Sequence, residues 1–292
     1  SLGAIGVGTL LGATASASIL GGGGRPPMPP GGMPPGGPGG PGGGPGGQGD
    51  ADTIKSADGQ CSTLPTETQG PYPADGSSAS GQTKNILENS GIVRSDVTRS
   101  TTGKTVSGVP LTLTLQLVDV NGNCAPLAGH VIYIWHCTAA GEYSLYSQGI
   151  TAEDYLRGVQ VADDSGTVSF TSIFPACYSG RWPHIHLEVY PDVDSATDVD
   201  NVIATSQVAF PQDMLTQVYA RDEYDVSTRN LEGVGSVEDD EIFADSLDQQ
   251  LATITGSVSK GYTASLAVHV DTTTEPSAGG GMGGGGQPPS QG

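Results

Sequence analysis

The sequence predicts an all-β protein, an antiparallel β-sandwich with few short helices and Gly/Pro-rich tails. Its middle contains many short segments rich in β-branched and aromatic residues, and apolar and polar residues alternate in the clearest of them. Turn-forming Asn, Asp, Ser and Gly separate these segments. Only two short stretches have helical character. Many short strands joined by turns are typical of a sandwich.

The expected strands follow one another along the middle of the chain. The first covers residues 110–119, and Asn121-Gly122 after it is a hairpin turn signal. The other expected strands are, in chain order, 130–137, 158–161, 167–171, 184–190, 204–210, 251–255 and 262–270. Helices are expected at 213–219, directly after a proline, and at 239–246.

Composition divides the chain into four parts. Residues 1–20 are small and apolar with an A-x-A pattern, so we expect the later part of a secretory signal peptide; a frayed terminus is the alternative. Residues 21–49 are nearly all Gly and Pro and are expected to form a linker. Residues 50–272 are expected to form one domain and residues 273–292 a disordered Gly-rich tail. The protein is therefore expected to be secreted.

The charge balance excludes several partners. The formal net charge is -20, from 11 basic and 31 acidic residues. Nucleic acids and anionic lipids are bound through clusters of Lys and Arg, so neither is an expected partner. No segment is long and apolar enough to be expected to span a membrane.

The four cysteines form an even set: Cys61, Cys124, Cys137 and Cys177. In an exported protein such a set favours two disulfides. Three pairings are possible, and the sequence does not choose among them. A zinc site is disfavoured because no two of these cysteines have C-x-x-C spacing.

A pair of histidines stands on the expected strand 184–190. Side chains alternate along a strand, so His184 and His186 share one face, with Cβ atoms roughly 6.5–7 Å apart. Two imidazoles at that separation can bind one metal ion. The alternative is that each is a partly buried, hydrogen-bonded histidine, and spacing alone leaves both interpretations open.

Two tyrosines add a second kind of ligand. Tyr178 lies six residues before His184, and Tyr143 follows a turn after the expected strand 130–137. Alone, Tyr143 would be an ordinary loop tyrosine with a half-buried ring. Two phenolates with two imidazoles suit a hard trivalent ion such as Fe(III) better than Zn(II). The charge of the ion would keep both phenols ionised, far below their ordinary pKa of about 10.

With these residues the chain resembles the intradiol ring-cleavage dioxygenases, the family of the catechol and protocatechuate dioxygenases. The likeness covers most of residues 61–211 and extends more loosely to 271. Its most specific element is Arg181-Trp182-Pro183-His184-Ile185-His186, which is similar to the family's R-P-x-H-I-H. The other matching segments are Thr68-Gln69-Gly70-Pro71-Tyr72, Asn85-Ile86, Arg94-Ser95-Asp96-Val97, Trp135-His136-Cys137, Gly141-Glu142-Tyr143 and Thr205-Ser206-Gln207-Val208-Ala209-Phe210-Pro211.

The resemblance implies a non-haem Fe(III) centre whose ligands are Tyr143, Tyr178, His184 and His186. It also implies a catechol substrate that reacts with O2 and opens to a cis,cis-muconate. Tyr178 would leave the metal and accept a substrate proton. Arg181 would stabilise charge on the ring, and Gln207 would be a hydrogen-bond donor beside it. The alternatives are a surface ion pair for Arg181 and an exposed strand residue for Gln207.

Three departures from the family pattern concern substrate and assembly. Gln69 replaces the usual Glu, and only residues 179–183 separate Tyr178 from His184, which predicts a more open site. The helical N-terminal region of the intracellular catechol enzymes has no counterpart here, so their dimer is not expected. The sequence does not determine the oligomeric state.

Two other functions compete with this one. A non-catalytic β-sandwich module could bind an aromatic or polysaccharide ligand, with metal absent or structural. A zinc hydrolase could use the paired histidines. The hydrolase is disfavoured because no carboxylate motif completes a zinc triad beside His184 and because the tyrosines would have no role.

Overall fold

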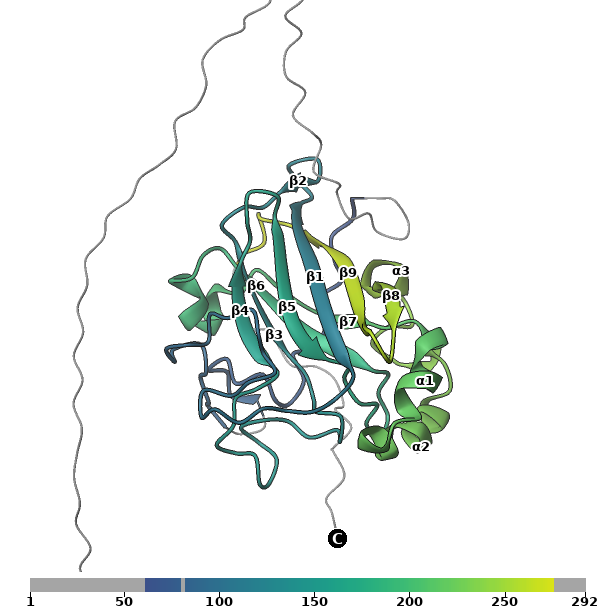
Figure 1. Ribbon diagram of the computed structural model, residues 1–292. Coiled ribbons are helices and arrows are strands. Elements are labelled where there is room, and N and C mark those ends of the chain that lie inside the picture. The colour runs from purple at the N-terminus through teal and green to yellow at the C-terminus, as the bar shows by residue number, and fades with distance from the viewer. Residues whose placement is uncertain (1–60, 80–81, 276–292) are drawn as a thin grey trace, which may run out of the picture. The chain divides into compact units, whose positions relative to one another are not determined.

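The computed structural model describes residues 61–79 and 82–275, which form two β-sheets packed face to face with helices at one side (Figure 1). The first sheet has the order β2-β1-β9-β8, and β5 pairs with β1. Its strands are β1 (Pro110–Asp119), β2 (Ala125–Pro126), β5 (Thr167–Ile173), β8 (Thr253–Ser257) and β9 (Gly261–Val270). The second sheet has the order β4-β3-β6-β7. Its strands are β3 (Val131–Trp135), β4 (Arg157–Val161), β6 (His184–Tyr190) and β7 (Ala204–Ala209).

Strand β1 shows why the alternating sequence forms a sandwich. Leu111, Leu113, Leu115 and Leu117 are fully buried, while the threonines between them are more exposed in the outer half of the strand. Burying an aliphatic side chain contributes about 1.5–3 kcal/mol, so this face must pack against the other sheet. The strand is central in its sheet because β5 and β9 flank it.

Strand β6 is buried on both faces, and this places the paired histidines inside the protein. Ile185, Leu187 and Val189 point toward the core between the sheets, so His184 and His186 point to the opposite face. Strands β3 and β7 hydrogen-bond to the two edges of β6, with His186 opposite Trp135 of β3.

The predicted fold class is confirmed, and the predicted strands agree with the structure except near their ends. One pairing differs in direction, because β1 and β9 run parallel. The turn at Asn121-Gly122 leads into the two-residue strand β2, which pairs with the end of β1. The next long strand, β3, lies in the other sheet.

The helical segments lie between β7 and β8. They are α1 (Leu215–Tyr219), α2 (Asp225–Val234) and α3 (Leu247–Gln250), with short 3-10 turns at Gln212–Met214, Asp222–Tyr224 and Val237–Asp239. Two more 3-10 turns, Ser195–Thr197 and Val199–Asn201, lie between β6 and β7. Figure 1 shows α1, α2 and α3 beside β8. The helix expected at 213–219 is confirmed by α1 and the turn before it.

The helix expected at 239–246 is wrong. The chain forms turns there, between the 3-10 turn Val237–Asp239 and α3. The buried side chain of Asp240 accepts a hydrogen bond from the amide of Ile242, 2.9 Å away, which favours a turn over a helix. Adjacent carboxylates from Glu238 to Glu241 also repel one another.

Two cysteines are paired and two are free. Cys61 and Cys124 form a disulfide that joins the start of the described chain to the turn after β1. Cys137 and Cys177 are buried free thiols, so the expectation of two disulfides is wrong. Each free thiol donates to a backbone carbonyl, that of Ala176 for Cys137 and that of Arg181 for Cys177.

Several expectations fall on residues that the structure does not describe. The signal peptide at 1–20, the linker at 21–49 and most of the tail at 273–292 lie outside residues 61–79 and 82–275. Among the described residues, no helix has the length and apolar character that crossing a membrane requires.

Candidate active site

The two histidines and two tyrosines singled out in the sequence come together on the outer face of the second sheet. His184 and His186 stand on β6, Tyr178 lies in the loop before it, and Tyr143 lies in the loop after β3. All four are buried, with exposed fractions of 1–7%. Because β3 and β6 are neighbours in the sheet, the loops that leave them meet at one end.

The polar atoms of three of these residues converge closely. Tyr178 Oη is 3.1 Å from His184 Nε2, and His184 Nε2 is 3.1 Å from His186 Nε2. The ring of Tyr143 lies 6.1 Å from that of Tyr178, measured between centroids, at a steep angle. Four donors from three segments therefore surround one point.

Burial keeps all four groups neutral in the metal-free protein. It lowers the pKa of His184 and of His186 well below the ordinary value, and the charge of Arg181 lowers both further. Burial raises the pKa of Tyr143 well above 10. It also raises the pKa of Tyr178 to about 12, although Arg181 opposes that shift. A bound cation would favour the phenolates and leave the imidazoles neutral, which are the forms that bind metal.

The donor set fits a metal ion. Nδ1 of His184 donates to the carbonyl of Trp182, 2.5 Å away, so its Nε2 carries a lone pair toward His186 and Tyr178. Two imidazole nitrogens bound to one ion at about 2.1 Å lie about 3 Å apart when the angle between them is near 90°. Within residues 61–79 and 82–275, no group of three or more His, Cys, Asp or Glu could hold a metal, so the phenols are needed to complete a set of ligands.

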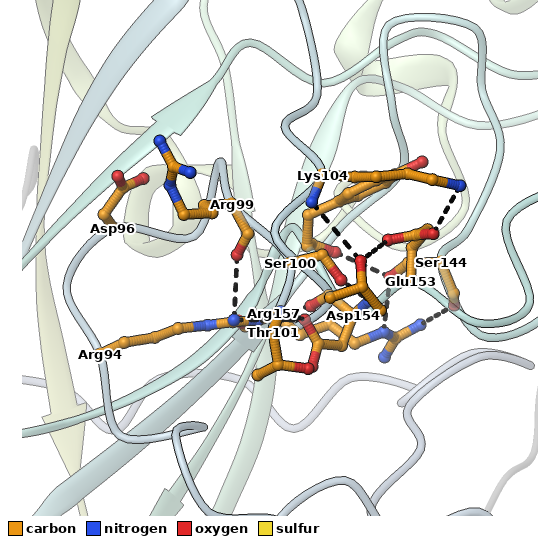
Figure 2. A network of polar contacts seen from close by, with 12 residues as sticks. Arg94, Asp96, Arg99, Ser100, Thr101, Lys104, Ser144, Glu153, Asp154 and Arg157 are labelled. Atoms are coloured by element: carbon orange, nitrogen blue, oxygen red, sulfur yellow. Dashed lines mark hydrogen bonds and ion pairs between the residues drawn. The ribbon is translucent and has the colours of Figure 1, made fainter. Parts of the chain in front are cut away.

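A buried arginine fixes the loop that carries Tyr143. Arg157 is fully buried at the start of β4, and its Nη2 and Nε donate to the carbonyl and hydroxyl of Ser144, each at 3.1 Å. Its Nη1 donates to the carbonyl of Pro73 at 2.9 Å and to Tyr133 Oη at 3.1 Å. Figure 2 shows Arg157 directed at Ser144, the residue after Tyr143.

A second polar network supports this arginine from the other side (Figure 2). Arg94 donates to the carbonyl of Arg157 and forms an ion pair with Asp154 at 3.2 Å. Asp154 also accepts the amide of Thr101 at 2.8 Å. The matching segment that begins at Arg94 therefore has a structural role, holding the start of β4 in place.

The segment Thr68–Tyr72 passes directly over His186. Gly70 has a left-handed backbone with φ of +68°, and a Cβ added there would lie 3.0 Å from His186 Cε1. Tyr72 packs its ring 4.8 Å from that of Tyr143. Gln69, the departure from the family's Glu, is buried and donates to Ser77 Oγ at 3.1 Å. This segment closes one side of the site.

Arg181 and Gln207 are linked beside the histidines. Arg181 Nη2 donates to Gln207 Oε1 at 2.7 Å, and Gln207 Nε2 donates to the carbonyl of Thr68 at 2.8 Å. Gln207 stands on β7 opposite His186 and is fully buried. It is therefore neither exposed nor free to turn, and it connects Arg181 to the segment over His186.

Sequence reasoning missed three residues that support the site. Asp240 pairs with Arg181, Arg157 holds Ser144, and Trp135 stacks on His186 with its ring centroid 4.9 Å away. Trp135 had a signal, because it precedes His136 in a matching segment. Asp240 had none, because it lies in a run of acidic residues that is typical of a solvated surface.

Comparison with known proteins agrees with this arrangement. A family model described as "Dioxygenase" matches residues 82–227, half of the chain. A chlorocatechol 1,2-dioxygenase from Rhodococcus opacus is 35% identical over 93 residues, which cover 25% of this chain and 35% of that protein. The chain thus matches only about a third of the length of that relative.

Solved structures extend the likeness over the described domain. An intradiol ring-cleavage dioxygenase from Tetranychus urticae is 26% identical, with a TM-score of 0.55 over 73% of this chain and 96% of that one. A second solved dioxygenase is 24% identical, with a TM-score of 0.58 over 75% of this chain and 98% of that one, which is a likeness of fold. On the family match and these structures, the chain belongs to the intradiol ring-cleavage dioxygenases.

Proposed function

We propose that this protein is a non-haem Fe(III) dioxygenase that cleaves catechols between their two hydroxyl-bearing carbons. The observation that carries the proposal is the convergence of Tyr178 Oη, His184 Nε2 and His186 Nε2, with 3.1 Å between neighbours and Tyr143 alongside. The non-catalytic binding module is not favoured, because it gives no reason for these buried groups to meet.

In this proposal Tyr143, Tyr178, His184 and His186 hold the iron. A ferric ion there supplies Lewis acidity that binds both catechol oxygens as the dianion and prepares the ring to react with O2. Tyr178 has a second task. Its phenolate oxygen accepts a proton from a substrate hydroxyl, which a group of raised pKa does readily.

Arg181 and Gln207 act on the substrate side of the site. The guanidinium of Arg181 is close enough to lower the pKa of both histidines, so it is also close enough to stabilise negative charge on the ring oxygens. Gln207 holds Nη2 of Arg181 and is itself held by Thr68, so the cation is oriented before the substrate arrives.

The reaction needs no partner beyond catechol and O2. The bond between the two hydroxylated carbons breaks, each of these carbons gains one oxygen atom, and the product is a cis,cis-muconate. Both oxygen atoms enter the product, so no external reductant is consumed. The proposed export of the protein is supported by the Cys61–Cys124 disulfide, because such bonds persist in oxidising compartments.

Metal analysis combined with a visible spectrum tests the proposal. Iron-loaded protein is expected to show a broad visible band from tyrosinate-to-iron charge transfer, and to consume one O2 for each muconate formed from catechol. Stoichiometric ferric iron without that band would contradict the ligand set. Absence of ring cleavage by the coloured protein would contradict the activity.

Tyr178→Phe and Tyr262→Phe make a matched pair for this test. Both remove one hydroxyl from a buried tyrosine, but Tyr262 stands on β9, in the other sheet. Tyr178→Phe is expected to shift the band and slow turnover about a hundredfold, as expected when a general base is lost. Tyr262→Phe is expected to keep both. Equal spectra for the two variants would remove Tyr178 from the ligand set.

A further inference from the structure

Asp240 is the partner of the arginine in the site, although it lies 59 residues away in the chain. Its side chain is fully buried, and Oδ2 accepts Nε of Arg181 at 2.9 Å. The same oxygen accepts the amide of Trp182 at 2.6 Å, and Oδ1 accepts the amide of Ile242 at 2.9 Å. Three donors hold this carboxylate, so its position is fixed by the backbone on both sides of the contact.

The contact with Asp240 leaves a defined part of Arg181 for a ligand. Nε is bound to Asp240 and Nη2 to Gln207. In the described part of the chain, Nη1 of Arg181 has no hydrogen-bond partner. The guanidinium also lies over the ring of Phe243, 5.8 Å from its centroid, and Phe243 in turn lies 6.4 Å from the ring of His184. The arginine is therefore clamped on two edges, with its third edge free.

The local charge is balanced rather than positive. Asp240 compensates Arg181 at hydrogen-bonding distance. A second carboxyl, that of the half-buried Glu67, is near enough for Arg181 to oppose the rise in its pKa. The other buried cation, Arg157, directs its donors at Ser144, Pro73 and Tyr133.

We propose that Asp240 positions Arg181 and cancels its charge, so that the site takes catechols whose ring carries no carboxylate. This inference rests on the proposed function and names the substrate class of that site. Asp240 is a positioning residue, since it acts on the substrate only through Arg181.

The physical reason is the cost of an additional negative charge. A catechol bound as the dianion already brings two negative charges to the ligands. A ring carboxylate adds a third, which needs an uncompensated cation in a site where water is excluded. With Arg181 already paired, the carboxylate would lose its hydration and gain no full countercharge. A neutral substituent of similar size loses much less.

The first experiment compares two substrates of the wild-type, iron-loaded protein. 4-Methylcatechol and 3,4-dihydroxybenzoate carry their substituents at the same ring position, so they differ mainly in charge. The expected kcat/KM is at least about a hundredfold higher for 4-methylcatechol. Comparable values for the two would overturn the inference while leaving the proposed function intact. Cleavage of neither, by protein with the visible band, would instead overturn the proposed function.

The second experiment removes the countercharge. Asp240→Asn keeps the shape of the side chain but leaves Arg181 unneutralised, and Glu241→Gln removes the same charge from the exposed neighbouring residue. In Asp240→Asn the ratio of the two kcat/KM values is expected to fall at least about tenfold, with the change in KM of the carboxylated substrate and with the visible band kept. Glu241→Gln is expected to keep the wild-type ratio.

Asp240→Glu separates positioning from simple support of the fold. It restores the charge but moves it by one methylene, so it is expected to recover the wild-type ratio and to lower kcat for both substrates. A purely structural role would lower both substrates equally in Asp240→Asn, and an unchanged ratio in that variant would overturn the proposal. If Asp240→Asn does not fold, the wild-type comparison and Asp240→Glu decide the question.

Discussion

The contact between Gly70 and His186 gives the sharpest test of how the site is built. An alanine at residue 70 would place its Cβ 3.0 Å from Cε1 and 3.4 Å from Nε2 of His186. Carbon atoms in ordinary contact are about 3.5–4.0 Å apart, so the ring must move by about 0.5 Å. His186 is stacked on Trp135 with an angle of 2° between the rings, which restricts how far it can turn.

Two costs add in Gly70→Ala. The left-handed backbone, with φ of +68°, costs a residue with a Cβ about 1–2 kcal/mol. Displacing the imidazole from its rotamer costs about another 0.5–1.5 kcal/mol. Gly129→Ala is the matched control, because Gly129 has φ of +80° and no atom within 4 Å of its added Cβ. The control carries the first cost without the second.

Thermal unfolding and iron titration measure the difference. Gly70→Ala is expected to be about 1 kcal/mol less stable than Gly129→Ala, which is about 2–4 °C in Tm for a domain of this size. Its iron affinity is expected to fall at least about tenfold, since a displaced imidazole no longer points at the metal. Equal stability and equal iron affinity in the two variants would refute the close packing of Gly70 on His186.

Three further predictions concern buried polar groups. Arg157→Met is expected to lose about 3 kcal/mol of stability and to weaken iron binding, because several acceptors lose their donor, whereas exposed Arg99→Met loses neither; equal denaturation midpoints would contradict this. Burial raises the pKa of Cys137 and of Cys177 to about 12, so neither thiol is expected to react with iodoacetamide at pH 8 until the protein is unfolded, when mass spectrometry should count two; rapid labelling of the native protein would contradict their burial. Burial lowers the pKa of His136 to about 4, so between pH 6.5 and 4 only the unfolded state takes up this proton, and stability falls as pH falls. The loss totals about 3 kcal/mol, and urea unfolding of His136→Gln should show a shallower pH dependence than wild type.

The strands could be predicted because each depends on a local pattern. The alternation from Pro110 to Asp119 requires one face to be buried, whatever sheet the strand joins. The choice of partner is not local. Asn121-Gly122 predicts a tight turn, and the turn is present, but it leads into a two-residue strand rather than into β3. The same limit applies to the cysteines, because only the folded chain brings Cys61 beside Cys124 and leaves the other two thiols unpaired.

The difference between the parts of the site has the same origin. Tyr178, His184 and His186 lie within nine residues, so strand alternation and one short loop are enough to bring them together. The charge of Arg181 depends on Asp240, a contact made only after the chain has passed through β7, α1 and α2. An acidic residue in a chain of net charge -20 gives no sign that it will be buried. The ligands can therefore be recognised from sequence in this protein, whereas the charge offered to a substrate depends on the distant segment that covers the arginine. Relatives that keep R-x-x-H-I-H but lack an acid at the position of Asp240 are expected to accept carboxylated catechols, and exchange of residues 236–243 between two such proteins should transfer that preference together with the segment.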